Sequence, residues 1–356
     1  MNLFELRGVL PTRTRVVLEV VGILILLGLW SLLTVGSNPV VPSGILPSPG
    51  RVLGAMGQVF VENELIVNLC RSIGLNVCGY LEAIIISIIF GFVVGLLPLF
   101  NGLFAKPIDA FRFVPLTGVI GLFIVWFGLG VTMKVHFLAF GILIYMLPVI
   151  VTRINEVEDV YLKTAYTLGA SKWQIIRTVY IPHVLSKFSD DIRVLTAISW
   201  TYIIIIESIG NEGGLGALMW RTGIRQGNIA KLFAMLFIII IIGFIQDKLF
   251  TMMDRKLYPY KYLKESLKTA GELKSQTLFQ RVKSNMLPIL GLLSAAVMLV
   301  LLINEFVGIL GKNDILSYAF GATFPVIAIL MGVFSVWIIF DFVHQTKSKK
   351  MTLKKA

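Results

Sequence analysis

Eight apolar segments run through this chain, each near the roughly 20 residues that a helix needs to cross a lipid bilayer. They lie at about 16–35, 74–100, 113–131, 134–152, 190–209, 231–250, 286–310 and 316–343. Since 56% of the 356 residues are hydrophobic and only 15% are charged, one water-soluble core could not bury the apolar surface. The chain is therefore predicted to be an all-α polytopic membrane protein. The first segment is long for a secretory signal and no clear small-x-small cleavage site follows it, so we expect it to be retained.

Lysine and arginine are distributed unevenly between the two sides that these segments separate. With the N-terminus inside, the cytoplasmic segments hold 23 of them and the opposite side holds 7, while Arg193 and Lys248 lie within spans and complete the 32. Because short cytoplasmic loops are enriched in these residues, both termini are predicted to be cytoplasmic. The net charge of +12 then reflects topology. The basic residues are not gathered with stacking aromatic side chains on a soluble surface, so no nucleic acid partner is expected.

The polar segment 153–187 separates two of the apolar segments and is predicted to form two short helices with a bend. Small and apolar side chains recur in it at helical spacing, at Val157, Tyr161, Ala165 and Leu168. This periodicity predicts an amphipathic helix over 156–168. The predicted topology places the segment in the cytoplasm, where it could dock a soluble partner. A helix lying on the lipid surface is the alternative.

The corner between the two short helices is thin. Gly169 suits the left-handed position that ends a helix, and Ala170 adds little bulk. Ser171 can cap a second helix that runs through Val179. Pro182 is expected to stop that helix, because proline cannot continue the backbone hydrogen-bond ladder. A groove on another protein could close on such a corner without steric conflict.

The sequence offers no site for catalysis, metal or cofactor. A phosphate-binding loop of the form G-x4-G-K-[ST] is missing, since Gly311-Lys312 is followed by Asn313 and lacks the upstream glycine. The chain is therefore not expected to hydrolyse nucleotide. The three histidines, His136, His183 and His344, lack the spacing of metal ligands, and no catalytic grouping can be assigned. We predict a non-enzymatic membrane protein.

Several short motifs occur in order along the chain. They are Leu46-Pro47-Ser48-Pro49, Val114-Pro115, Trp126-Phe127-Gly128-Leu129-Gly130, Leu168-Gly169-Ala170-Ser171 with Ile181-Pro182, Glu207, and Gly213-Gly214-Leu215-Gly216. This ordered set resembles the membrane-spanning permease subunits of bacterial ATP-binding cassette importers, in particular the nitrate, sulfonate, taurine and bicarbonate class. The resemblance covers about residues 14–262.

The resemblance implies a type I importer permease core of about six transmembrane helices over 16–262, in the bacterial inner membrane. Such a permease carries a small anion or a polar organic solute by alternating access. Its implied partners are separate ATPase subunits that hold ATP and Mg²⁺, a second permease copy or paralogue, and an extracytoplasmic substrate-binding protein. Membrane lipid surrounds the assembly, and no cofactor is implied on this chain itself.

In that family a short cytoplasmic helix fits a cleft on the ATPase, and the resemblance places this coupling segment at 153–187. The coupling residues it implies are Tyr161, Lys163, Thr164, Ala165, Leu168, Gly169, Ala170, Ser171 and Pro182. The family's motif usually begins Glu-Ala-Ala, whereas this chain has Lys163-Thr164-Ala165. Because a base replaces an acid, we expect the cognate ATPase to present a more acidic rim here.

Glu207 lies near the outer end of the fifth apolar segment. A charge within a spanning helix costs about 2.5–3.5 kcal/mol at the bilayer centre, so this carboxylate is expected to face a polar cavity or a partner. Its family-matching position favours organisation of a gate, and Trp200, Gly213 and Gly214 are the other expected path residues. The alternative is a structural hydrogen bond to Asn211 or to the backbone of the glycine turn.

Two arginines follow the glycine turn on the predicted outer side. Arg221 and Arg225 are four residues apart on one face of the short segment 217–226. They could pair with acidic residues on a substrate-binding protein. Ordinary solvated surface charge is the alternative.

Four further features within the spans favour structural roles. We expect Glu19 and Glu82 each to be paired between helices. Gly91-x3-Gly95 permits close packing of two helices. Cys70 and Cys78 are predicted to be small buried side chains.

The chain continues for almost a hundred residues past Tyr258-Pro259-Tyr260, where permeases of this class usually end. The predicted parts outside the core are a cytoplasmic N-terminus (1–15), a basic linker (263–285) and a two-span hairpin with a basic tail (286–356). The linker is predicted to be an amphipathic helix at 262–273. The tail is predicted to be disordered and attracted to anionic head groups. The hairpin could pack against the sixth span and recruit an accessory subunit, or only thicken and anchor the bundle.

A secondary transporter driven by an ion gradient, or a membrane scaffold that transports nothing, is the competing interpretation. A secondary transporter would predict an inverted internal repeat or a discontinuous helix with charged coupling sites. Neither stands out in the sequence. The ATP-driven importer is therefore the preferred prediction.

Overall fold

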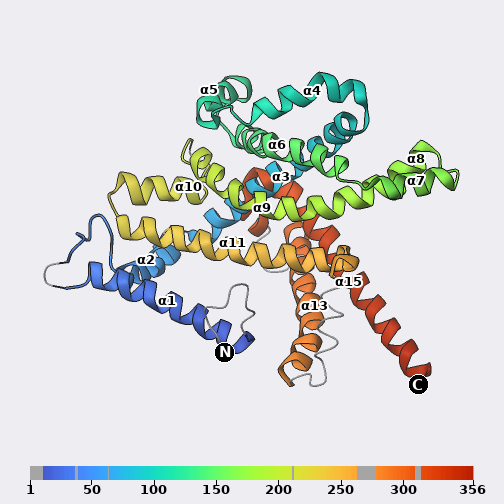
Figure 1. Ribbon diagram of the computed structural model, residues 1–356. Helices are drawn as coiled ribbons and strands as arrows, with labels where there is room; N and C mark the ends of the chain where they lie inside the picture. The colour runs from blue at the N-terminus through green and yellow to red at the C-terminus, as the bar shows by residue number, and fades with distance from the viewer. Residues whose placement is uncertain are drawn as a thin grey trace. The chain divides into compact units, whose positions relative to one another are not determined.

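The computed structural model describes residues 11–36, 39–62, 64–210, 212–262, 278–308 and 314–355, and these residues form helices without any strand. The α-helices are α1 Thr12–Thr34, α2 Pro49–Glu62, α3 Leu65–Leu96, α4 Pro98–Phe111, α5 Leu116–Phe127, α6 Val131–Asn155, α7 Asp159–Thr167, α8 Lys172–Ile175, α9 Ile181–Glu207, α10 Leu215–Leu218, α11 Ile229–Leu257, α13 Leu278–Val307, α14 Ile315–Phe320 and α15 Phe324–Lys355 (Figure 1). Short π-helical turns are η1 Ile176–Tyr180 and η2 Met219–Arg225, and 3-10 turns are η3 Pro259–Tyr262 and η4 Gly321–Thr323. The all-α prediction is confirmed.

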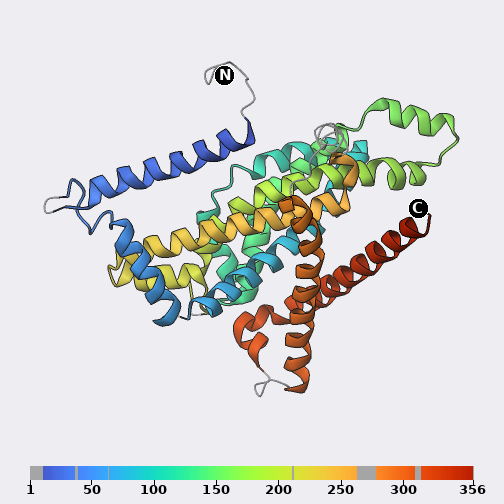
Figure 2. The same cartoon turned by 90° about the horizontal axis from the view of Figure 1, so that it is seen from below.

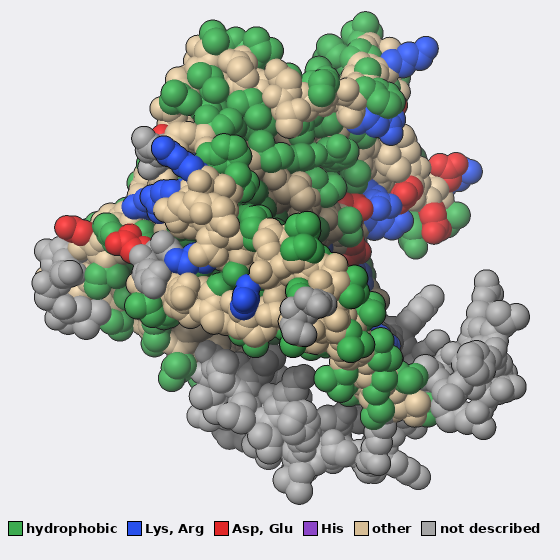
Figure 3. Space-filling model, turned by 90° about the vertical axis from the view of Figure 1, so that its left-hand side faces the viewer, with side chains coloured by type: hydrophobic (Ala, Val, Ile, Leu, Met, Phe, Trp, Pro, Cys, Tyr) green, Lys and Arg blue, Asp and Glu red, His purple; other side chains and the backbone are tan. Residues whose placement is uncertain are grey.

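Five helical stretches among the described residues are long and apolar enough to cross a membrane. They are Thr14–Thr34, Leu65–Leu96, Val131–Asn155, Ile229–Leu257 and Ile315–Val343. A sixth is present if the bent pair α4 and α5 counts as one span. The predicted segments 190–209 and 286–310 largely overlap the 27-residue α9 and the 30-residue α13, which end at Glu207 and Val307. Hydrophobic side chains cover much of the outward surface in Figure 3, as expected of helices that face lipid.

The predicted span at 113–131 is wrong as a single helix. α5 has only 12 residues, and α4 meets it at a bend of 106°. The break contains Val114-Pro115, where proline disfavours a helical conformation of the residue before it. Gly128 ends α5 with a φ of +73°. A helix of 12 residues is about 18 Å long, which is too short to cross the hydrocarbon core alone.

The chain divides into two compact units, Met1–Leu65 with Leu218–Ile240 and Ile66–Ala217 with Ile241–Ala356. In the first unit Val52, Ala55 and Ala234 are buried together. Trp30 stacks on Phe237 with ring centroids 5.6 Å apart. The Trp30 indole also donates a hydrogen bond of 3.0 Å to the carbonyl of Pro47. The Leu-Pro-Ser-Pro motif therefore helps to anchor the end of α1.

Glu19 is an exception to the expected pairing between helices. Its carboxylate accepts a 2.9 Å bond from Arg15, one turn earlier on α1. The expectation was wrong because residues four apart on a helix are already neighbours.

The core of the second unit is built by α3, α6 and α9. Its fully buried side chains include Leu138, Met146, Ile150, Val184 and Phe188. α6 and α9 lie side by side along much of their length (Figures 1 and 2). This packing places the long helix α9 against a broad apolar surface.

Close contact between α3 and α6 confirms two predictions from the sequence. A Cβ on Gly91 would lie 2.5 Å from Cγ2 of Ile150, and one on Gly95 would lie 2.5 Å from Cδ1 of Ile154. Only glycine therefore lets the two helices approach this closely. Glu82 of α3 also pairs with Nδ1 of His136 of α6 at 2.7 Å.

Two predictions about the terminal regions have different outcomes. The basic tail was predicted to be disordered, and this is wrong because α15 continues to Lys355. The predicted amphipathic helix at 262–273 lies outside the described residues beyond Tyr262, as do residues 1–10 of the predicted N-terminal segment.

We expect Gly91→Val to destabilise the fold, because the added side chain would overlap Ile150. Overpacking of a tight core costs about 1–3 kcal/mol. Gly121→Val is the matched control, since Gly121 is also helical but has open space around it. Thermal unfolding in detergent, followed by circular dichroism, should show a lower midpoint for Gly91→Val than for the control. Equal midpoints would contradict the packing interpretation.

Candidate functional site

An elbow is formed by α7 and α8, which project from the end of α6 and α9 (Figures 1 and 2). The helix predicted over 156–168 is present as α7, Asp159–Thr167, with Leu168 at its C-cap. Gly169 has a φ of +78°, which confirms the left-handed position. Ser171 caps α8, and its hydroxyl and backbone N–H both bond to Gln174 in a capping box. The sequence therefore encodes both sides of the bend.

The prediction that Pro182 stops the second helix is wrong. α8 passes through the π-turn η1 and into α9 without interruption, and Pro182 lies in the first turn of α9. Hydrogen bonds in a π-turn join residues five apart, whereas those in an α-helix join residues four apart. A widened turn can therefore accommodate proline, which has no backbone N–H to donate. The consequence is one continuous helical rod from Lys172 to Glu207, roughly 50 Å long at 1.5 Å per residue.

Large apolar side chains stand exposed around the elbow. They are Val160, Tyr161, Tyr166, Leu168 and Trp173, and Leu168 is 82% exposed. Lys163 is also exposed and lies 3.9 Å from Asp159. Thr164 and Thr167 turn their hydroxyls back onto helix carbonyls. The elbow therefore presents apolar side chains together with the exposed basic residues Lys163 and Lys172, a surface suited to a partner that covers it.

A charge cluster fixes the base of the elbow to the rod. The guanidinium of Arg153 binds both carboxylate oxygens of Asp191, at 2.7 and 2.8 Å. It also donates to Glu156, which accepts a further bond of 3.1 Å from Lys187. These two basic groups hold the pKa of Glu156 below its usual value. A bidentate pair fixes orientation as well as distance, so α6 and α9 are joined rigidly where the elbow begins.

Glu207 occupies the other end of the rod and is almost completely buried. Its carboxylate accepts bonds from the hydroxyl of Ser72, at 2.7 and 2.8 Å, and from the backbone N–H of Gly216, at 2.8 Å. Ser72 accepts in turn from the N–H of Leu215. The carboxylate therefore ties α9 to α3 and to the glycine turn. The bond from Gly216 is a structural hydrogen bond to the backbone of the glycine turn, the alternative that the sequence left open beside a gate. Asn211 lies outside the described residues.

The glycine turn closes around this carboxylate. Gly213 and Gly214 have φ values of +85° and +105°. The N–H of Gly214 donates to the side chain of Asn68 at 2.9 Å. A Cβ at Gly214 would overlap the Glu207 carboxylate. Gly214 is therefore required both by its backbone conformation and by the close approach of Glu207.

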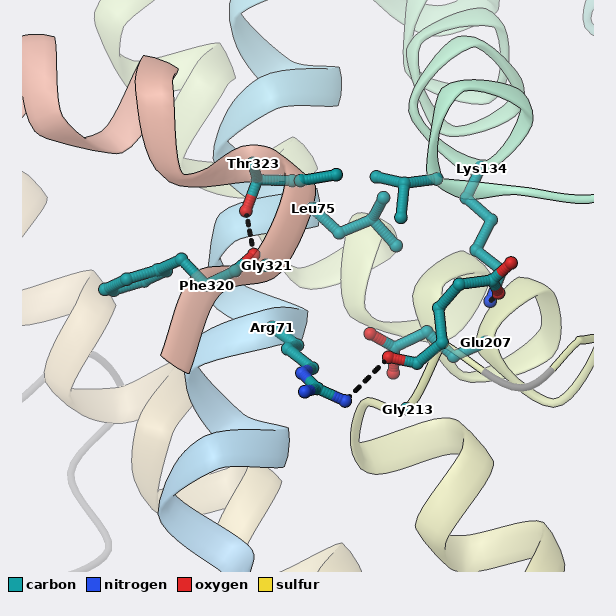
Figure 4. A pocket seen from close by; sticks show the side chains of 11 residues that line it. Arg71, Leu75, Lys134, Glu207, Gly213, Phe320, Gly321 and Thr323 are labelled. Carbon is teal, nitrogen blue, oxygen red and sulfur yellow. Dashed lines mark hydrogen bonds and ion pairs between the residues drawn. The ribbon is translucent and has the colours of Figure 1, made fainter. Parts of the chain in front are cut away.

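A cavity of about 340 Å³ lies beside the turn (Figure 4). Lys134 pairs with Glu212 at 2.5 Å, and Arg71 donates a 2.9 Å bond to the Glu212 carbonyl. The opposite wall comes from Phe320 to Thr323, in the C-terminal hairpin. Two cationic and two anionic side chains thus line one cavity together with apolar residues.

The other predicted site residues lie elsewhere. Trp200 is buried, and its indole donates a 2.9 Å bond to Gln246 of α11, so it is not brought to the cavity. Arg221 and Arg225 are exposed on η2, within the first unit. Their exposure is compatible with either interpretation of these arginines.

The polar stripe of α3 that contains Ser72, a partner of Glu207, was missed in the sequence. Asn68, Ser72 and Asn76 are four residues apart along the apolar helix α3 and are all buried. Asn76 bonds to Ser199 of α9 at 3.0 Å. Buried polar side chains need partners, so this stripe at helical spacing was the available signal for a helix contact.

Residues 83–258 match the family profile described as "Binding-protein-dependent transport system inner membrane component". The chain is similar to the taurine transport system permease protein TauC of Escherichia coli (strain K12), with 26% identity over 255 residues, covering 70% of this chain and 92% of the relative. It is also similar to the putative aliphatic sulfonates transport permease protein SsuC of Bacillus subtilis (strain 168), at 25% over 241 residues, covering 67% and 85%.

The riboflavin transport system permease protein RibX of Chloroflexus aurantiacus is 29% identical over 181 residues, covering 50% of this chain and 66% of the relative. Among solved structures, a chain of the MetNI methionine ABC transporter in inward facing conformations has a TM-score of 0.42 and 20% identity, covering 50% of this chain and 92% of that chain. The elbow and the Glu207 turn fall inside the matched profile, whereas the C-terminal hairpin lies beyond it.

We expect Gly214→Ala to destabilise the chain more than Gly227→Ala. Both glycines have positive φ, but Gly227 has open space around it. A left-handed backbone costs an L-residue about 1–2 kcal/mol, and Gly214→Ala adds the overlap with Glu207. Thermal unfolding of the two variants in detergent separates these effects. A similar loss of stability in both would show that Glu207 does not constrain the turn.

Proposed function

We propose that this chain is the membrane permease subunit of an ABC importer for small solutes, because residues 83–258 match the profile of the binding-protein-dependent transport family and the chain is similar to taurine and sulfonate permeases. Separate ATPase subunits grip the elbow α7–α8. A second permease copy or paralogue and an extracytoplasmic substrate-binding protein complete the assembly. The chain resides in the bacterial inner membrane with both termini cytoplasmic, as the 23 to 7 distribution of lysine and arginine supports.

The continuous rod from α8 to α9 is the observation that carries this mechanism. Its cytoplasmic end begins at the capped bend of the elbow, and its outer end carries Glu207. The Arg153 to Asp191 pair makes α6 move with the rod. When two ATPases close on ATP and Mg²⁺, displacement of the elbow is transmitted as rigid-body movement to the Glu207 turn. The cavity beside that turn then changes its access from one side to the other.

Glu207 organises the gate and does not bind the solute directly. Its carboxylate is occupied by Ser72 and Gly216, and a carboxylate is a poor ligand for an anion. The solute we propose is a small anion or polar organic compound of the nitrate, sulfonate, taurine and bicarbonate kind. Similarity to the taurine and aliphatic sulfonates permeases supports this class.

Gly169→Arg should abolish capture of an ATPase by this chain. Affinity purification in mild detergent from the native membrane, followed by mass spectrometry, should find a phosphate-loop ATPase with the wild type. Gly169→Asn is the matched control, because asparagine tolerates the left-handed conformation and adds little bulk. Gly227→Arg controls for a bulky base at another glycine of positive φ. Loss in all three variants, or an ATPase absent from the wild type, would contradict the coupling role.

Lys163→Glu should weaken binding of the cognate ATPase, because we expect that ATPase to present an acidic rim. Lys163 is exposed on α7, so the substitution leaves the fold intact. Affinity can be measured by titrating the purified ATPase onto the chain in nanodiscs at low and high salt. The loss should shrink at high salt, since exposed charges are screened. Equal affinity of Lys163→Glu and wild type would exclude the acidic rim.

A further inference from the structure

We propose that the outer end of the C-terminal hairpin, residues 315–323, is a lid on the cavity beside the Glu207 turn and parts from α3 during transport. The hairpin is α13, α14, η4 and α15, and it lies beyond the residues that match the family profile. This inference rests on the proposed function, since it gives the added hairpin a part in the same alternating-access cycle.

The lid contacts the core at Gly74 of α3. Gly74 is flanked by the side chains of Thr323 and Phe320, and a Cβ on Gly74 would overlap the Thr323 hydroxyl. Leu75, the next residue of α3, lines the cavity together with residues 320–323 (Figure 4). Leu75 of α3, Glu207 of α9 and residues 320–323 line the same cavity, so these parts of the chain lie on one side of the membrane. The hairpin thus covers the cavity where the gate residues lie.

Glu305 and Thr323 form hydrogen bonds within the hairpin itself. Glu305 accepts the backbone N–H groups of Leu316 and Ser317, at 2.9 and 3.0 Å. The Thr323 hydroxyl donates to the carbonyl of Phe320 at 2.8 Å. Separation of the tip from α3 therefore leaves these groups bonded. If opening broke hydrogen bonds and left buried polar groups without partners, each such group would cost about 1–3 kcal/mol.

The helix is interrupted at the tip of the hairpin, and this interruption is where the tip can bend. α14 ends at Gly321, which has a φ of +56°, and the short turn η4 separates it from α15. The space around Gly321 is open. Interrupted helices beside a transport cavity are a recurring arrangement, since irregular backbone is tolerated where it lines such a space.

The opposite end of the hairpin is held to the core by charge. Lys256, at the end of α11, pairs with Asp341 of α15 at 2.5 Å and lies 5.0 Å from the ring centre of Trp337. α13 and α15 also pack against each other. The hairpin is therefore anchored near its cytoplasmic end, and its outer tip rests on α3 through Thr323 and Phe320. This asymmetry favours movement at the tip.

A disulfide across the contact tests the lid. In a chain carrying Cys70→Ala and Cys78→Ala, the pair Gly74→Cys with Thr323→Cys places the two Cβ atoms near 3.2 Å, slightly less than the roughly 3.5–4.5 Å usual in disulfides. Gly291→Cys with Ile338→Cys is the control pair, because it joins α13 to α15 inside the hairpin, where a Cβ on Gly291 lies 3.7 Å from Cγ2 of Ile338. Both pairs are oxidised in the assembled complex in nanodiscs.

We expect oxidation of the Gly74–Thr323 pair to abolish ATP hydrolysis by the complex, and a reducing agent to restore it. Trapping with ATP and vanadate before oxidation should lower the yield of this disulfide and leave the control pair unchanged. Unaltered hydrolysis, or a yield independent of nucleotide, would show a fixed wall and overturn the lid. Failure of this pair to oxidise while the control pair does would remove the contact itself. A wild-type chain that captures no ATPase would instead remove the proposed function.

Discussion

Backbone N–H and C=O groups find no water in the core of a bilayer, so a chain this apolar must satisfy them within its own helices. Every departure from a regular helix in the spanning region therefore needs a local compensation. The glycine turn shows such compensation, because its N–H groups donate to Asn68, Ser72 and Glu207. Outside the predicted spans, η1 widens the rod just before Pro182. The irregular positions of the second unit are also those to which we assign coupling and gating. Helices move as rigid bodies, and the chain changes conformation at the interruptions between them.

Glu207 shows why a costly group is retained at such a break. The carboxylate gives up water and receives in exchange the Ser72 hydroxyl and the N–H of Gly216. These donors come from α3 and from the turn, so one side chain joins three parts of the chain. Removing a single partner would leave buried polar groups unsatisfied, so the fully paired network fixes one arrangement of α3, α9 and the turn. A gate benefits from that property.

Much of the elbow could be predicted from the sequence because its signals are local. Gly169 and Ser171 act through their own backbone and nearest neighbours, and the structure has them in the expected positions. Pro182 was misjudged because its effect depends on the hydrogen-bond register of the preceding turn. The break between α4 and α5 was missed for a related reason, since uniform apolar composition around Val114-Pro115 hides a change of direction.

The environment of Glu207 could be predicted only in part, because its partners lie far away in the sequence. A position in an apolar helix showed that the carboxylate needed a polar neighbour, but not that Ser72, 135 residues earlier, would supply it. The stripe of Asn68, Ser72 and Asn76 marks one face of α3 without naming the facing helix. Neither sequence segment predicts the contact of Thr323 with Gly74, since small residues are common in membrane helices.

The base of the elbow and the turn η3, which follows α11, both bond to α9 in the part of the rod far from Glu207. Lys261 of η3, just before the hairpin, pairs with Asp190 of α9 at 3.2 Å, one residue from the Asp191 that holds Arg153. Tyr262 and Lys261 also bond to Asp254 of α11. The start of the added segment is therefore tied to the helix that the elbow displaces. Movement of the rod would reach the hairpin at its anchored end as well as through the cavity, so a lid built in this way opens in step with the gate it covers.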